Sequence, residues 1–88
     1  MPGEMTHAIP DGVLTAQLEG EAVLLDLQTK RYYRLNATAA RIWQGVADRF
    51  EPGQIVDALM QEFAVERATA QSETERTLDD LRARGLLT

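Results

Sequence analysis

The side chains that could support catalysis are few in this 88-residue chain, and their spacing does not bring them together. Cysteine is absent, His7 is the only histidine, and Ser72 is the only serine. A nucleophile needs a base within hydrogen-bonding reach, and neither residue has such a partner nearby in the sequence. Asp79 and Asp80 are adjacent, so on a helix their carboxylates would point about 100° apart. We therefore expect no enzymatic activity, no metal site and no cofactor.

The charge distribution points to binding instead. The chain has 14 acidic and 9 basic residues, a net charge of −5 and a pI near 4.7. Nucleic-acid-binding proteins usually carry a basic face, so this balance argues against DNA or RNA as partner. A local cationic group nevertheless forms from Lys30, Arg31, Arg34 and Arg41. It is consistent either with a solvated surface or with a site for an anionic partner segment.

Alternation of apolar and polar residues predicts strands in the first part of the chain. The segment 13–18 alternates, and Glu19-Gly20 follows as a two-residue hairpin turn, with Gly20 supplying a positive φ. This turn predicts two apolar cross-strand pairs, Leu14 with Leu25 and Ala16 with Val23.

A second hairpin leads into a third strand, 31–35. A three-residue loop, 28–30, keeps one face of the sheet apolar, whereas a two-residue loop would pair Leu25 with Arg34. The longer loop requires Lys30 to adopt the left-handed conformation. It predicts the pairs Leu25 with Tyr33 and Val23 with Leu35. The face toward the helices would then hold Leu14, Ala16, Leu18, Val23, Leu25, Tyr33 and Leu35, and the outer face Leu24, Asp26, Tyr32 and Arg34.

The rest of the chain has helical periodicity. Asn36 is a favoured N-cap for a first helix over 37–49, in which Ile42, Trp43 and Val46 form a buried stripe. A second helix begins near Pro52, and a third runs over 68–84 before Gly85. Three antiparallel strands followed by three helices form an α+β, winged-helix-like domain over residues 12–88. Residues 1–11 lack periodicity and are expected to form a flexible N-terminal arm.

No apolar run approaches the roughly 18 residues that would span a membrane, and the N-terminus lacks the pattern of a secretory signal. We therefore expect a cytoplasmic protein with no membrane partner. A winged-helix-like fold also raises the possibility of a DNA-binding regulator. The first half of the third helix is acidic or neutral where phosphate contacts would be needed, which disfavours that function.

Two stretches carry a resemblance to a known family. The first runs from Leu24 to Trp43 and includes Leu-Asp-Leu, Arg-Tyr-Tyr-Arg-Leu-Asn and Ala-Ala-Arg-Ile-Trp; the second runs from Leu78 to Leu87. Together they resemble the PqqD family of leader-peptide recognition domains (RiPP recognition elements), and most of all its stand-alone members from lasso-peptide pathways. Among such relatives, Gly is common where this chain has Lys30, and larger apolar residues are usual at Thr74 and Thr77.

The resemblance implies a non-catalytic module that captures the leader of a ribosomally made precursor peptide. The leader would add as a β-strand to the edge of the third strand, in a groove against the third helix. The module would then deliver it to a maturation enzyme such as a leader protease, or, in the PqqD-type alternative, to a radical SAM enzyme. Periodicity alone is equally consistent with a half-exposed face on the third helix. The expected peptide-binding residues are Arg31, Tyr32, Tyr33, Arg34, Leu35, Thr74, Thr77, Leu78 and Leu81.

Overall fold

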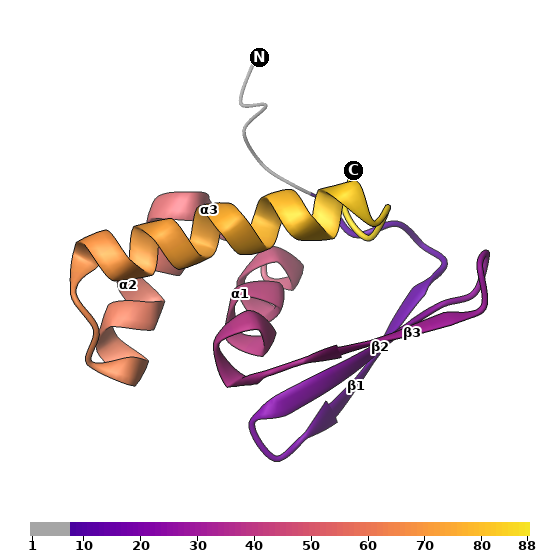
Figure 1. Ribbon diagram of the computed structural model, residues 1–88, viewed down its shortest axis with the longest axis horizontal. Helices are drawn as coiled ribbons and strands as arrows, with labels where there is room; N and C mark the ends of the chain where they lie inside the picture. The colour runs from indigo at the N-terminus through magenta and orange to yellow at the C-terminus, as the bar shows by residue number, and fades with distance from the viewer. Residues whose placement is uncertain (1–7) are drawn as a thin grey trace.

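The computed structural model describes residues 8–88, which form a small sheet followed by three helices (Figure 1). The elements in chain order are β1 (Val13–Leu18), β2 (Glu21–Asp26), β3 (Arg31–Leu35), α1 (Ala37–Ala47), α2 (Pro52–Phe63) and α3 (Arg67–Ala83). The sheet is antiparallel with the strand order β1-β2-β3, so the predicted α+β class and element order are confirmed. No helix in the described part of the chain is long and apolar enough to cross a membrane.

Most of the expected N-terminal arm, residues 1–7, lies outside the described residues. The described part of the arm, residues 8–11, is hydrogen-bonded to the C-terminus. The carbonyl oxygen of Ala8 accepts a hydrogen bond from the backbone N–H of Thr88 at 2.9 Å. Residues 8–10 therefore lie at the C-terminal end of the chain, and their backbone does not extend along β3.

The first hairpin has the predicted register, with Leu14 opposite Leu25 and Ala16 opposite Val23. Both residues of its turn have positive φ, 29° at Glu19 and 85° at Gly20. Such a turn has the right-handed twist of the flanking strands, which explains why two residues suffice to connect them.

The predicted register of the second hairpin is wrong by one residue. Asp26 pairs with Arg31 and Leu24 with Tyr33, so the loop has four residues, 27–30. Its closure depends on Asp26, whose carboxylate accepts hydrogen bonds from the N–H groups at positions 28 and 29, at 2.9 and 3.4 Å. The Asp26 carbonyl oxygen also accepts from Lys30 N at 2.7 Å. Lys30 adopts the left-handed conformation that was expected, with φ 64°.

In β1 and β2, the face that was predicted to meet the helices is the more exposed one, and the predicted outer face is the more buried one. Leu24 is fully buried and Asp26 is buried, whereas Leu14 and Leu18 are each 50% exposed. The inner face toward the helices instead includes Val13, Ala22, Leu24 and Asp26. Cross-strand pairs determine which residues share a face, but not which face meets the helices, so the correct pairs of the first hairpin did not prevent this error. In β3 the assignment holds, because Leu35 is buried, Tyr33 is half-buried, and Tyr32 and Arg34 are exposed.

The helices begin and end at local signals. Asn36 caps α1, its side-chain oxygen accepting from Ala39 N at 2.9 Å. α1 ends before the predicted Arg49, which is left-handed with φ 65°. α3 ends at Ala83, with Arg84 as its C-cap, and the following Gly85 is left-handed, as predicted. Leu86 N donates to Leu81 O at 2.9 Å.

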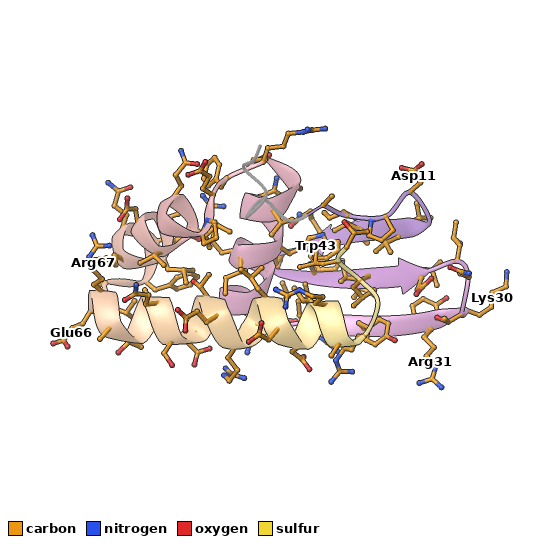
Figure 2. The ribbon with its side chains drawn as sticks, turned by 90° about the horizontal axis from the view of Figure 1, so that it is seen from above. Asp11, Lys30, Arg31, Trp43, Glu66 and Arg67 are labelled. Carbon is orange, nitrogen blue, oxygen red and sulfur yellow. The ribbon has the colours of Figure 1, made fainter. Side chains whose placement is uncertain are left out.

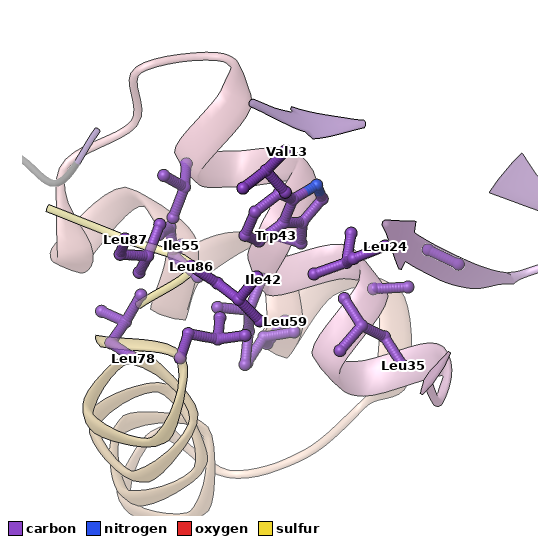
Figure 3. Close-up of a cluster of buried hydrophobic side chains, with 14 of the residues drawn as sticks. Val13, Leu24, Leu35, Ile42, Trp43, Ile55, Leu59, Leu78, Leu86 and Leu87 are labelled. Carbon is purple, nitrogen blue, oxygen red and sulfur yellow. The ribbon is translucent and has the colours of Figure 1, made fainter. Parts of the chain in front are cut away.

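A single hydrophobic core joins the helices to the inner face of the sheet (Figure 3). Trp43 and Ile42 from α1 are at its centre, as expected for that stripe. The largest fully buried side chains are Trp43, Leu24, Ile42, Ile55, Leu59 and Leu86. α1 packs beneath α3 and next to the sheet (Figure 1). Residues of β3 and α3 together line two cavities beside it.

Candidate peptide-binding groove

Two adjoining cavities lie between β3 and α3, and we call them together the β3–α3 groove. One, of about 170 Å³, is lined by residues at the end of β3 and start of α1 and by Thr77 and its neighbours on α3. The other, of about 300 Å³, extends toward the start of β3 and the C-terminal end of α3. The two share Arg34, Leu35, Asp80 and Leu81. The groove therefore follows the length of β3.

The outer edge of β3 has unpaired backbone groups within the described part of the chain. In a two-residue hairpin the residues that flank the turn exchange hydrogen bonds, so Glu21, Val23 and Leu25 bond to β1. Alternation then directs Ala22, Leu24 and Asp26 to β3, where they pair with Leu35, Tyr33 and Arg31. The N–H and C=O groups of Tyr32 and Arg34 consequently point away from the sheet. They can accept one further strand.

The walls of the groove combine an apolar floor with charged rims. Tyr33, Leu35 and Leu81 supply apolar surface. At one end, the Arg84 guanidinium lies 5.6 Å from the centroid of the Tyr33 ring and binds Asp80 at 3.1 Å. The cation–π contact connects the C-terminal end of α3 to β3, while the ion pair lies within that end of α3. Along the edge, Arg34 pairs with Glu21 at 3.2 Å, but 77% of its side chain stays exposed.

The structure brings together six of the nine predicted peptide-binding residues. These are Tyr32, Tyr33, Arg34, Leu35, Thr77 and Leu81. Thr74 and Leu78 instead line a separate cavity of about 400 Å³ on the other flank of α3, facing α2. Arg31 is exposed at the start of β3 and lines neither cavity of the groove.

Several groove residues were not predicted from the sequence. They are Asn36, Ala39, Glu73, Arg76, Asp80, Arg84 and Leu86. Those on α3 lie three or four positions from Thr77 or from one another, so helical spacing from Thr77 and Leu81 could have identified them.

The groove has the features of a binding surface, with outward backbone groups, an apolar floor and charged side chains. Among residues 8–88, no group of three or more His, Cys, Asp or Glu side chains is arranged to hold a metal ion. Three acidic residues of α3 form exposed ion pairs: Glu73 with Arg76, Asp79 with Arg82 and Asp80 with Arg84.

Comparison with known proteins identifies the family. The family model for coenzyme PQQ synthesis protein D (PqqD) matches residues 21–87. The chain is 38% identical to TbiB1, solved in complex with the TbiA(beta) leader peptide, with 91% of this chain and 93% of that one covered and a TM-score of 0.85. It is 29% identical to a lasso peptide synthetase B1 complexed with its leader peptide, with 94% and 98% covered and a TM-score of 0.85. No curated protein matches the chain. Because the family model covers most of its length, this chain belongs to the PqqD family.

Proposed function

We propose that this protein is a non-catalytic module that binds the leader segment of a ribosomally made precursor peptide. The observation that carries the proposal is the open edge of β3, with the backbone groups of Tyr32 and Arg34 directed outward beside the β3–α3 groove. Two solved relatives with the same fold were determined with leader peptides bound, which supports a peptide as the ligand.

The leader would add to the sheet as a fourth strand. Backbone hydrogen bonds to Tyr32 and Arg34 would determine its direction and register. Every second side chain of the peptide would then enter the groove and contact Tyr33, Leu35 and Leu81, while Thr77 contributes a hydroxyl near the groove wall. Arg31 at the start of β3 would act by charge on acidic residues of the leader.

The similarity to a lasso peptide synthetase B1 over 94% of this chain favours a lasso-peptide precursor as the source of the leader. The module would deliver the captured precursor to a separate maturation enzyme, such as a leader protease. The PqqD family match also supports the alternative in which that enzyme is a radical SAM protein. Either function would place the module in the cytoplasm, where precursors are synthesised.

The test separates backbone pairing from side-chain contacts. Arg34→Pro removes an outward N–H, whereas Arg34→Ala keeps it and removes only the exposed guanidinium. Binding is measured by fluorescence anisotropy with the labelled TbiA(beta) leader, and with the labelled leader of any precursor peptide found to be encoded near the gene for this chain. We expect at least a tenfold loss for Arg34→Pro and a change of only a few-fold for Arg34→Ala.

Circular dichroism controls for folding of both variants. If Arg34→Pro folds and binds the leader as tightly as the wild type, strand addition at β3 is refuted. If neither leader binds the wild-type protein, the leader-binding function itself is refuted.

A further inference from the structure

The sheet has a second open edge, on β1, and the chemistry of this edge differs from that of β3. All six residues of β1 are uncharged, and five of the six are exposed. β3 instead carries Arg31 and Arg34 and follows Lys30. Proteins usually protect edge strands from self-association by charges, prolines or bulges. β1 has no charged residue, no proline and no bulge. From this contrast we infer that β1 is the site at which a second copy of this chain pairs.

The backbone of β1 is suited to pairing. Leu14, Ala16 and Leu18 bond to β2, so Thr15 and Gln17 direct their N–H and C=O groups away from the sheet. Within residues 8–88 the sheet has no strand beyond β1. In Figure 2, β1 lies on the side of the sheet farthest from α3, so α3 does not cover this edge.

The strand is complementary to itself in one antiparallel register. A two-fold axis at Ala16 sets Thr15 of one copy opposite Gln17 of the other, and the reverse. Each of these pairs can exchange two backbone hydrogen bonds, which gives four in total. The same register places Leu14 beside Leu18 of the second copy on the outer face of the sheet, where both are now 50% exposed.

The resulting dimer would have a continuous six-stranded sheet with a β3 edge at each end. Both β3–α3 grooves would stay accessible, so the inference does not depend on whether they bind leaders. The paired surface is small, and we therefore expect a reversible dimer instead of a permanent one. The competing edge-to-edge arrangement, through β3, would block both grooves and brings like charges together.

The test measures the oligomeric state of the full-length protein by sedimentation velocity from about 10 µM to about 500 µM, the range in which small interfaces associate. We expect the sedimentation coefficient to rise with concentration toward that of a dimer. Ala16→Lys sets two like charges opposite each other on the two-fold axis, and we expect it to leave only monomer. Gln17→Pro removes an outward N–H from the same edge, with the same expected result.

Two controls locate the contact. Ala47→Lys adds the same charge at an exposed position at the end of α1, and Arg34→Pro alters the β3 edge. Both should dimerise like the wild type, while Ala16→Lys should bind leader peptide like the wild type. Monomer at every concentration overturns the inference. So does a dimer that persists in folded Ala16→Lys, or one that Arg34→Pro abolishes.

Discussion

The indole N–H of Trp43 donates a hydrogen bond to the Thr15 hydroxyl at 2.9 Å, connecting the centre of the core to the first strand. Trp43 is 1% exposed and is the only tryptophan in the chain. A buried indole N–H needs an acceptor, and within β1 the hydroxyl of Thr15 supplies it. This contact helps explain why the Thr15 face of β1, and not the more apolar Leu14 face, meets the helices.

Replacing Thr15 by Val removes that acceptor without changing the shape of the side chain. We expect the free energy of unfolding to fall by about 1 to 2 kcal/mol, because the indole N–H is left unsatisfied. Urea denaturation followed by Trp43 fluorescence measures the change. Thr69→Val, at an exposed position of α3, is the matched control and should change stability by less than about 0.5 kcal/mol. Equal effects of the two substitutions would contradict the role of the hydrogen bond.

Gly45 allows α1 and α2 to approach each other closely. A Cβ atom at this position would lie 2.8 Å from Ile55 Cγ1, which is closer than atomic contact permits. Gly45→Ala should therefore destabilise the protein by about 1 to 3 kcal/mol, although alanine is the better helix former. Gly53→Ala in α2 meets nothing within 4 Å and should be neutral or stabilising. Thermal unfolding of both variants tests the comparison, and a stabilised Gly45→Ala would show that Ile55 or the helices can adjust at little cost.

Thr74 buries a hydroxyl that has no hydrogen-bond partner, and its side chain is 1% exposed. An unsatisfied hydroxyl costs folding free energy, whereas a methyl group of the same size does not. Thr74→Val should raise the free energy of unfolding by about 1 kcal/mol and leave leader binding unchanged. Chemical denaturation and anisotropy provide the two measurements, again with Thr69→Val as control. If Thr74→Val lowered the free energy of unfolding, the Thr74 hydroxyl would have to make a stabilising hydrogen bond in the folded protein.

Charge at the start of β3 should strengthen leader binding. Arg31 is exposed beside the groove, so Arg31→Gln should weaken binding of an acidic leader about two- to fivefold at low salt, and less at about 0.5 M NaCl. Arg67→Gln removes the same charge at the start of α3, where Arg67 pairs with Asp57 at 3.2 Å. That variant should bind normally. A salt-independent loss in Arg31→Gln would assign its effect to packing instead of charge.

The parts of the fold that follow from local chemistry could be predicted from the sequence. The turn at Glu19-Gly20, the Asn36 cap and the Gly85 terminus each depend on a few neighbouring residues, and all three are confirmed. The register of the second hairpin could not be predicted from apolar alternation, because the Asp26 carboxylate closes a longer loop through backbone hydrogen bonds. Such polar contacts are worth about as much as one apolar pair, so periodicity alone does not rank the alternatives.

The choice of face in β1 also depended on a long-range contact. Its alternation has apolar residues on both sides, and the Trp43 contact with Thr15 involves residues 28 positions apart. The groove was easier to anticipate on β3 than on α3. The apolar side of α3 divides between two cavities, because Thr74 and Leu78 lie about 60° around the helix from Thr77 and Leu81.

One residue, Asn36, separates the end of β3 from the start of α1. The Asn36 side chain caps α1 through a hydrogen bond to Ala39 N. No flexible linker therefore separates β3 from α1, and the strand cannot shift without moving the helix. A bound peptide would therefore pair with an edge whose position is already fixed, and reorganising β3 would cost little of the binding free energy. Selectivity among precursors would then depend mainly on how well each peptide fits this preformed edge.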